Sequence, residues 1–243
     1  MASDITRPAP TSKILPPLVR RLEALGISEI VVVFGLGTHR RMTVEEMDRL
    51  LGSSASLPSI QHDKDRCIHL GETSRGTPVE ILEEVAASDI KIGTGNIEYH
   101  YYAGYSGGAK ALLPGVSSER SINKNHAMMA DPRAKSGRLD NPVRLDMEEA
   151  AKIGGLDLIL NVVLNSKKEI VRAVGGDFVK AHRAGAKVVD EMYQRAVRPA
   201  EIVVACAGGR PKDIKPLPGP EGDGEREGGG PPRRLPHPRR RVR

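Results

Sequence analysis

The densest group of reactive residue types lies in one segment, His100-Tyr-Tyr-Ala-Gly-Tyr-Ser-Gly-Gly-Ala-Lys110. Its glycines carry no side chain, so backbone amides could approach an anion, and a helix beginning near Ala109 would point its positive end at a phosphate. The segment is not a Walker A loop, because Ala109 precedes Lys110 and Ala111 stands where that loop needs Ser or Thr. We therefore predict a phosphate-bearing ligand here. The alternative is a Gly-rich turn that only tightens a strand–helix junction.

Two other histidines accompany this segment. His39 follows an apolar run, at the position where open α/β sheets place their ligand sites. His126 is expected on a helix after Pro114-Gly115, where a neutral imidazole can bind a soft or borderline metal. Because the sequence has neither HExxH nor paired cysteines, the other ligands of such a metal would have to come from elsewhere, for example from a cofactor. Taken alone, each histidine is more simply a polar surface side chain.

A further pair of polar residues, Asp4 and Arg7, lies at the amino terminus in Asp4-Ile-Thr-Arg7-Pro8. The default interpretation of such a position is a frayed chain end. Arg7 could instead offer a two-pronged guanidinium to a carboxylate or phosphate, and Pro8 would hold Arg7 in an extended conformation.

Apolar, β-branched runs alternate with amphipathic stretches from Ile14 to Val204. This alternation predicts an α/β fold, a layered and largely parallel sheet with helices on both faces. The six runs expected as strands are Ile30–Phe34, Ser59–Gln61, Ile90–Gly93, Leu156–Leu164, Glu169–Val174 and Ile202–Ala205. The Gly-Thr-Gly-Asn sequence at residues 93–96 is expected to be a turn that leads into the segment of His100 and Lys110.

Several stretches carry the signals of helix ends. The clearest are Thr43–Gly52, Pro142–Ile153 and Phe178–Arg195. Thr43 and Glu46 have the spacing of a capping box. Asn141 can cap free backbone amides, and Pro142 suits the first helical position. These signals place helices between the expected strands.

The basic charge is concentrated at the carboxyl end. The chain of 243 residues has a net charge of +6, of which residues 211–243 carry +4. These residues include eight Pro, six Gly and seven Arg, a composition that cannot bury enough surface to fold. We expect residues 1–210 to form the folded domain and residues 211–243 a disordered tail, with a frameshift near Ile214 as one explanation. A nucleic-acid-binding tail is the weaker alternative, because the segment has no aromatic residue for base stacking.

Cysteine usage and apolar runs restrict the compartment. Cys67 and Cys206 are the only cysteines and form no CxxC pattern, so neither a disulfide framework nor a cysteine metal cluster is indicated. The first residues lack an apolar signal core, and no run approaches the roughly 18 apolar residues of a membrane span. We expect a cytoplasmic protein with neither nucleic acid nor membrane as a partner.

Taken together, five motifs closely resemble those of the nickel-dependent lactate racemase family. They are Asp4-Ile-Thr-Arg7-Pro, Gly37-Thr-His39-Arg, the segment from His100 to Lys110 with Pro114-Gly115, Asn125-His126, and Asn141-Pro-Val-Arg-Leu-Asp146-Met. The likeness covers about residues 4–214, and it is specific because both the order and the spacings agree. Lys110 follows His100 by 10 residues, and His126 follows Lys110 by 16.

The resemblance implies a cofactor, the nickel pincer nucleotide. This cofactor is a pyridinium-3,5-dithiocarboxylic acid mononucleotide that would be joined to Lys110 through a thioamide. The resemblance also implies that the pincer gives nickel a carbon and two sulfur ligands and that His126 gives the fourth. The residues that would help to hold the nucleotide are Asp4, Arg7, Gly104, Ser106, Gly107 and Gly108.

The reaction that the resemblance implies is racemisation or epimerisation of small 2-hydroxy acids such as lactate. His39 and His100 match the family's two acid/base histidines on opposite sides of the substrate, one of which removes the hydroxyl proton as hydride leaves the α-carbon. A histidine near its ordinary pKa of about 6.5 can both take and return this proton near neutrality. Arg7 would hold the substrate carboxylate or the cofactor. The implied partners are the 2-hydroxy-acid substrate and the proteins that synthesise the cofactor.

Two departures from the family leave alternatives open. Family members have more chain before the Asp-x-x-Arg motif, so their opening β segment is expected to be missing. After Ile214 the Pro/Gly/Arg-rich segment is expected to replace the family's second domain, which would then be largely absent. The first alternative is therefore a truncated, non-catalytic remnant that at most binds the cofactor. A weaker alternative is a nucleotide-binding hydrolase, against which the altered Walker pattern argues.

Overall fold

The computed structural model of the chain describes residues 1–196 and residue 201. Met1–Val197 form a single compact unit. The expected strand Ile202–Ala205, the expected domain boundary at residue 210 and the expected tail lie outside the described residues. Among the described residues, none of the helices is both long and apolar enough to cross a membrane.

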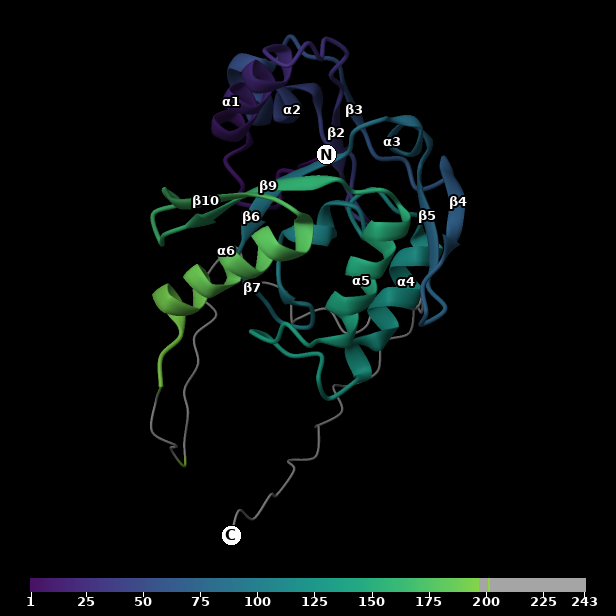
Figure 1. The fold of residues 1–243 in the computed structure, drawn as a ribbon, viewed down its shortest axis with the longest axis vertical. Coiled ribbons are helices and arrows are strands. Elements are labelled where there is room, and N and C mark those ends of the chain that lie inside the picture. Colours follow the sequence, from purple (N-terminus) through teal and green to yellow (C-terminus); the bar gives the residue numbers. More distant parts are fainter. Residues whose placement is uncertain (197–200, 202–243) are drawn as a thin grey trace, which may run out of the picture. The chain divides into compact units, whose positions relative to one another are not determined.

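Two three-stranded sheets form the centre of the unit (Figure 1). The first contains three parallel strands in spatial order, β1 (Ala2–Ser3), β2 (Val32–Gly35) and β3 (Ser59–Gln61). The second has β9 (Leu158–Leu164) in the middle, with β6 (Ile92–Ile97) parallel to it and β10 (Ile170–Gly176) antiparallel to it. The largely parallel α/β sheet predicted from the sequence is thus confirmed.

Met1 connects the two sheets through backbone hydrogen bonds. Its amino group donates to the carbonyl of Ile92 at 2.7 Å, and its carbonyl accepts from the amide of Thr94 at 2.8 Å. β1 therefore lies between β2 and the edge of β6, which brings the amino-terminal residues to the centre of the fold. The frayed chain end that we considered for Asp4 is not what the structure shows, because Asp4 is only 3% exposed.

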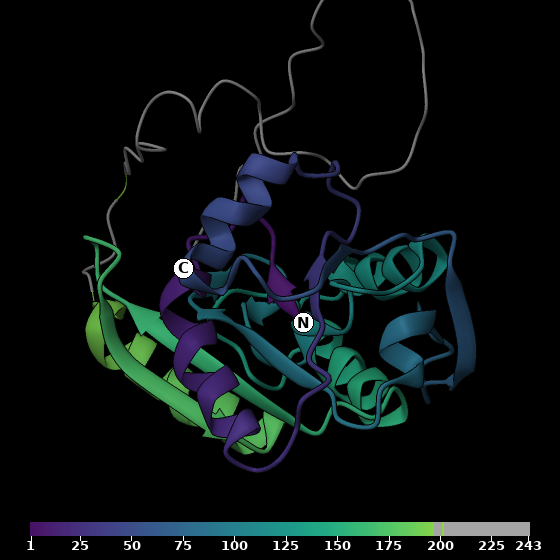
Figure 2. The same ribbon diagram turned by 90° about the horizontal axis from the view of Figure 1, so that it is seen from above.

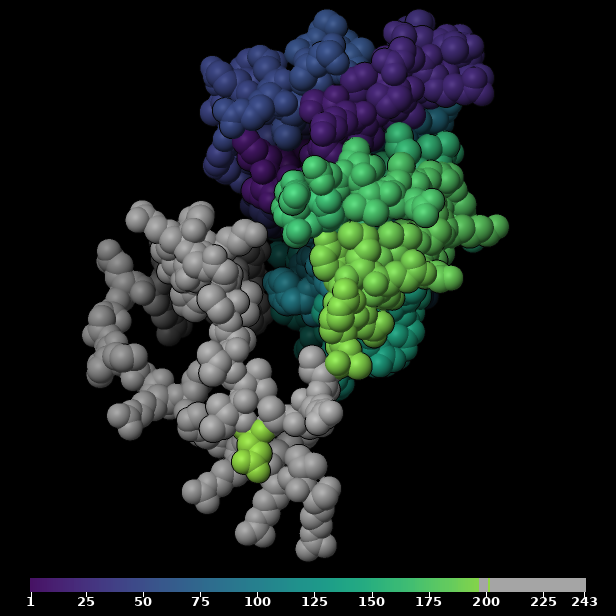
Figure 3. Space-filling view, turned by 90° about the vertical axis from the view of Figure 1, so that its left-hand side faces the viewer, coloured from purple at the N-terminus to yellow at the C-terminus, as the bar shows by residue number. Residues whose placement is uncertain are grey.

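Helices cover both faces of the second sheet (Figure 2). The six α-helices of residues 1–196 are α1 (Thr11–Glu23), α2 (Val44–Leu51), α3 (Glu83–Ala87), α4 (Glu119–Ala127), α5 (Pro142–Ile153) and α6 (Phe178–Tyr193). Side chains alternate along a strand, so Val162 of β9 packs with Ile14 of α1, whereas the next residue, Val163, packs with Val189 of α6. Helix α6 and strand β10 together cover one face of the unit (Figure 3).

Two antiparallel hairpins complete the unit. β4 (Cys67–Glu72) pairs with β5 (Pro78–Leu82), and the two-residue strands β7 (Tyr99–His100) and β8 (Gly104–Tyr105) pair with each other. None of these strands was predicted from the sequence. Three consecutive residues of β4, at positions 68–70, are all exposed, so this strand carries no alternating pattern of buried and exposed residues that could be read in advance.

The predicted turn at residues 93–96 is wrong. These residues continue β6, which runs to Ile97 and pairs with β9 along its whole length. The glycines are needed here because neighbouring chain segments come close. A Cβ at Gly93 would lie 2.8 Å from the Cβ of Ala111, and a Cβ at Gly95 would lie 3.2 Å from the hydroxyl of Ser3. A glycine inside a strand often marks such a close approach.

The helix expected to begin near Ala109 is reduced to a single 3-10 turn, Gly108–Ala111, because Pro114 cannot donate the hydrogen bond that would continue a helix. The other helix signals were confirmed. The Thr43 side chain accepts from the amide of Glu46 in a complete capping box, and Asn141 caps α5 with Pro142 at its start.

Candidate active site

Lys110 lies in the 3-10 turn that follows β8. Its amine is 5.8 Å from the centre of the Tyr102 ring. Burial and then the charges of Arg144 and Arg7 hold the pKa of this amine well below its ordinary value of 10.5, and no carboxylate of the described residues offsets them. A lowered pKa favours the uncharged amine, which is the nucleophilic form of lysine.

His126 stands opposite, near the end of α4, whose first turn is capped by Ser118. The Nε2 atom of His126 lies 3.0 Å from the hydroxyl of Tyr102. Burial, together with the charge of Lys110, lowers the pKa of this imidazole from 6.5 to about 4. The ring is therefore neutral near neutrality and has a nitrogen lone pair to offer, as a metal ligand requires.

His100 belongs to β7 and is only 8% exposed. Its Nδ1 atom accepts a hydrogen bond from the amide of Ala103 at 3.3 Å, so the proton of the neutral ring resides on Nε2. Burial lowers the pKa of His100 to about 2, and the charges of Lys110 and Arg7 act in the same direction. This histidine is a neutral N–H donor at physiological pH.

His39 follows β2 and pairs with Asp4, which follows β1, the neighbouring parallel strand. The His39 Nδ1 atom lies 2.6 Å from the Asp4 carboxylate, and the Thr6 hydroxyl donates to the same carboxylate at 2.7 Å. Burial opposes ionisation of Asp4, but the hydrogen bonds from His39 and Thr6 outweigh it and lower the pKa of Asp4. The His39 side chain is 41% exposed. An oriented histidine with one exposed nitrogen is suited to exchange protons with a ligand.

Arg7 lies close enough to Asp4, His100 and Lys110 for its charge to act on all three. Its backbone amide bonds to the Asp4 carbonyl at 3.2 Å, and its charge contributes to the lowered pKa values of Asp4, His100 and Lys110. The structure thus brings Arg7 together with His100, Lys110 and His126. Among the described residues no hydrogen bond or ion pair joins His39 to His100, although both lie near Arg7.

The Gly-rich loop is occupied by protein contacts. The Ser106 hydroxyl donates to the Asn96 carbonyl at 2.9 Å and accepts from the amide of Glu98 at 2.9 Å. The amide of Gly108, which we expected to be open to an anion, donates to Asn161 at 2.7 Å. Both Gly107 and Gly108 have positive φ angles, of 70° and 63°. In this conformation the glycines serve close packing within the protein.

A side chain at either Gly107 or Gly108 would clash with the protein, which also indicates that these glycines serve close packing. A Cβ at Gly107 would lie 2.7 Å from the Asn161 side chain, and a Cβ at Gly108 would lie 2.7 Å from the His182 ring. Sequence reasoning missed Asn161 and His182, and it missed Tyr102 and Arg144 as contacts of the site. Arg144 had a signal, since it lies in the Asn141-to-Asp146 motif.

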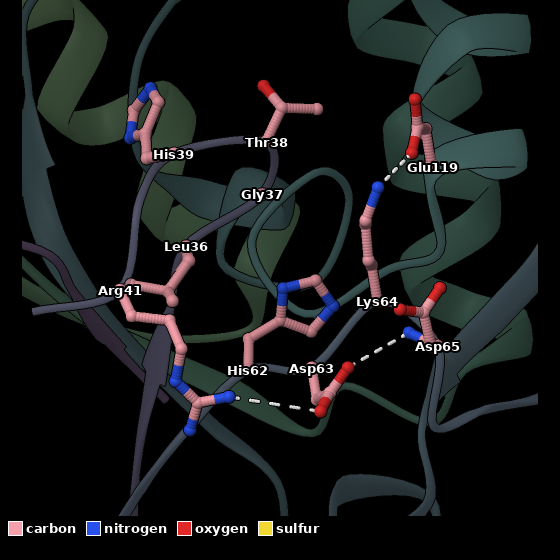
Figure 4. Close-up of a pocket in the computed structure, with 10 residues that line it drawn as sticks. All are labelled: Leu36, Gly37, Thr38, His39, Arg41, His62, Asp63, Lys64, Asp65 and Glu119. Atoms are coloured by element: carbon pink, nitrogen blue, oxygen red, sulfur yellow. Dashed lines mark hydrogen bonds and ion pairs between the residues drawn. The ribbon is translucent and has the colours of Figure 1, made fainter.

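A cleft of about 410 Å³ opens beside His39 (Figure 4). Its lining comprises Leu36, Gly37, Thr38, His39, Arg41, His62, Asp63, Lys64, Asp65 and Glu119. Two ion pairs neutralise much of its charge, Arg41 with Asp63 at 3.8 Å and Lys64 with Glu119. The cleft gives a small polar molecule access to His39.

Relatives of the chain are lactate racemases. Those of Lactiplantibacillus plantarum and Thermoanaerobacterium thermosaccharolyticum are 32% and 35% identical to it over 222 residues. Each alignment covers 88% of this chain and 52% of the relative, so the chain spans about half the length of these proteins.

Solved structures agree. The lactate racemase apoprotein from Thermoanaerobacterium thermosaccharolyticum matches with a TM-score of 0.76 and 34% identity, over 79% of this chain and 48% of that one. A Thermotoga maritima protein shares the fold, with a TM-score of 0.68 and 21% identity over 79% of this chain and 53% of that one. A family model described as the lactate racemase N-terminal domain matches residues 1–137. On these grounds, and in agreement with the motifs of its sequence, the chain belongs to the lactate racemase N-terminal domain family.

Proposed function

We propose that residues 1–210 form the catalytic domain of a racemase or epimerase of small 2-hydroxy acids, with a nickel pincer nucleotide attached at Lys110. Its relatives named lactate racemase support a racemase activity at the level of the family. Lactate is the default substrate within this class.

The observation that carries the proposal is the state of Lys110. Burying an amine without a carboxylate partner costs free energy, and proteins accept this cost mainly where the group reacts. Its lowered pKa increases the fraction of uncharged amine, the form that can attack an acyl or thioacyl carbon. A surface or purely structural lysine would have been exposed or paired.

The donor set around Lys110 fits a metal that arrives with most of its own ligands. No cluster of three or more His, Cys, Asp or Glu side chains among the described residues could hold a metal ion. His126 offers one neutral nitrogen, provided that the Tyr102 hydroxyl moves off it. The bound cofactor would supply nickel and a hydride acceptor.

The chain's own residues would then hold the substrate and move one proton. Arg7 is a cation without an acidic partner at its guanidinium in the described structure, so it suits the substrate carboxylate. Asp4 orients His39 through Nδ1, which leaves Nε2 to take the hydroxyl proton. His100, neutral and protonated on Nε2, would serve from the other side. His100 is buried and Lys110 is half-buried, so both side chains are partly shielded from water.

Loading of the chain with cofactor is the direct test. The chain is produced together with the cofactor-synthesis proteins, and its intact mass and nickel content are measured for the native sequence, Lys110→Ala and Lys124→Ala. Lys124 is an exposed lysine of α4 and serves as the matched control. We expect a mass increment and nickel in the native chain and the control, and loss of both in Lys110→Ala. Folded native protein that carries neither would contradict the proposal.

A further inference from the structure

Three buried side chains from three different elements hold the backbone of the loop before Lys110. Arg144 of α5 donates to the carbonyl of Tyr105 and, at 3.1 Å, to the carbonyl of Gly107. His182 of α6 bonds to the carbonyl of Ser106 at 2.9 Å, and Asn161 of β9 accepts from the amide of Gly108 at 2.7 Å. Each of four consecutive residues is thus fixed by a side chain distant in sequence.

We propose that Arg144 is the positioning residue for Lys110, because its two-pronged guanidinium fixes the turn that carries the lysine and places a permanent positive charge beside the amine. The inference rests on the proposed function, in which the Lys110 amine must form a covalent bond.

The connection between the two residues is short. The Gly107 carbonyl accepts from the Arg144 guanidinium and also from the backbone amide of Lys110, at 3.3 Å. Arg144 therefore bonds to the same peptide oxygen that closes the 3-10 turn of Lys110. Loss of the guanidinium would free the carbonyls of Tyr105 and Gly107, and the second of these lies between the two glycines with positive φ angles.

The charge of Arg144 is harder to explain by structure alone. Its side chain is fully buried, its Nε atom has no hydrogen-bond partner, and no carboxylate of the described residues forms an ion pair with it. The nearby Glu148 forms its ion pair with Arg183 at 2.6 Å, and its charge only partly offsets the effect of burial on the pKa of Arg144. Burying an unpaired cation costs several kcal/mol, and neutral donors would hold carbonyls at a lower cost. A role that needs the positive charge accounts for the arginine.

That role is to disfavour protonation of the Lys110 amine, which would place a second cation near Arg144. Burial lowers the pKa of Arg144 to about 10, so it stays charged at neutral pH. After burial, the charge of Arg144 is the largest cause of the lowered pKa of Lys110, ahead of that of Arg7. The same charge acts on His100 and His182, and both histidines are neutral. Arg144 thus adds to the effect of burial in favouring the unprotonated forms of the groups around the loop.

The test measures the reactivity of the Lys110 amine without any cofactor. Brief treatment with acetic anhydride acetylates an uncharged amine and releases acetate and a proton. The extent at Lys110 relative to Lys124 of the same molecule is measured by peptide mass spectrometry across a range of pH. Arg144→Gln removes the charge and keeps one hydrogen-bond donor. Arg144→Lys keeps the charge and loses the two-pronged guanidinium, the fork. The control is Lys152→Gln, which removes an exposed charge from the same helix.

We expect the native Lys110 to react at lower pH than Lys124. In Arg144→Gln the midpoint should rise and the rate at neutral pH should fall by about tenfold, the effect of one pKa unit, with a smaller fall in Arg144→Lys and none in Lys152→Gln. A merely structural role would slow the reaction as much in Arg144→Lys as in Arg144→Gln, because both variants lose the fork, and this outcome would overturn the proposal. An unchanged rate in folded Arg144→Gln would overturn it as well. If Arg144→Gln does not fold, a fall of tenfold or more in Arg144→Lys, which keeps the charge, would overturn the proposal.

This test is separate from that of the proposed function. Acetylation needs neither nickel nor the cofactor, so a failure here leaves the outcome of the mass and nickel measurements untouched. Conversely, a chain that takes up no cofactor would still show whether Arg144 controls the reactivity of Lys110.

Discussion

At the scale of single residues, this site is defined by groups that have lost their charge. Burial lowers the pKa of His100 to about 2 and that of His126 to about 4, and Lys110 shares their environment. The exception is Asp4, which burial alone would protonate but which stays ionised because His39 and Thr6 donate to it. The ionised carboxylate is therefore the group that distinguishes His39 from the other histidines.

The first prediction concerns this carboxylate. Asp4→Asn keeps the size of the side chain but removes the carboxylate that orients His39 through Nδ1. In cofactor-loaded protein we expect kcat for racemisation to fall roughly 100-fold, the usual contribution of a positioned acid/base group. The exposed Asp48 of α2 provides the control, Asp48→Asn, which should leave kcat unchanged. Native turnover in folded Asp4→Asn would show that His39 does not depend on Asp4.

At the scale of elements, three tyrosines of the segment that contains His100 make different contacts. They are Tyr99, Tyr102 and Tyr105. The Tyr99 and Tyr105 hydroxyls both donate to the carboxylate of Asp190 on α6, each at 2.7 Å. Tyr102 bonds instead to His126. Helix α6 thus clamps the two ends of the β7–β8 hairpin, and this hairpin delivers His100 and the loop of Lys110 to the site.

The second prediction tests this clamp. Asp190→Ala removes the acceptor of the Tyr99 hydroxyl and one of the two acceptors of the Tyr105 hydroxyl, which also donates to the Gly137 carbonyl at 3.2 Å. We expect a loss of about 2 kcal/mol in the free energy of unfolding. Burial and the Asp190 carboxylate raise the pKa of Tyr99 to about 12, so tyrosinate should form at lower pH in the variant. Urea unfolding and the absorbance of tyrosinate measure the two effects.

The neighbouring residue provides the control for the clamp. Glu191 is 62% exposed and lies 4.0 Å from Lys187, so Glu191→Ala should change stability by less than about 0.5 kcal/mol. Equal stability of Asp190→Ala and Glu191→Ala would show that the clamp contributes nothing.

At the scale of the whole molecule, buried histidines make stability depend on pH. The histidines whose pKa is lowered are His62, His100, His126 and His182. In the unfolded chain each takes up a proton near its ordinary pKa of 6.5, whereas the folded protein resists protonation. The unfolded state then binds more protons, so stability is highest above pH 6.5 and is lost as the pH falls from there toward the folded pKa.

The third prediction isolates one of these groups outside the site of Lys110. His62 is 3% exposed, and burial lowers its pKa to about 4. Its share of the loss of stability between pH 6.5 and 4 is at most about 3.4 kcal/mol, at about 1.4 kcal/mol per pKa unit. Urea unfolding at several pH values should give a shallower decline for His62→Gln than for the native chain. Equal slopes in His62→Gln and the native chain would refute the assignment.

Much of the architecture could be predicted because its signals are local. The capping box joins Thr43 to Glu46, and Asn141 caps amides two and three residues ahead, so the residue types and their spacing suffice. Apolar runs located the strands β2, β3, β9 and β10 to within about two residues. The order and spacing of the motifs around His39, Lys110 and His126 identified the family, which the similarity to known lactate racemases confirmed.

The rest depended on contacts between residues far apart in the chain. Gly107 and Gly108 invited the interpretation of a phosphate loop, but the atoms that require them to be glycine belong to Asn161 and His182, more than 50 residues away. The same holds for β6. Gly93 must lack a side chain because Ala111, from the loop of Lys110, packs against it.

The sequence by itself therefore determined the fold class, the helix ends and the family, because these follow from residue periodicity, local hydrogen bonds and motif order. Only the tertiary structure decided that Lys110 is buried without a carboxylate and that Arg144 stands behind it. The physical reason is that desolvation and Coulomb interactions depend on distances in space, which spacing along a chain does not fix.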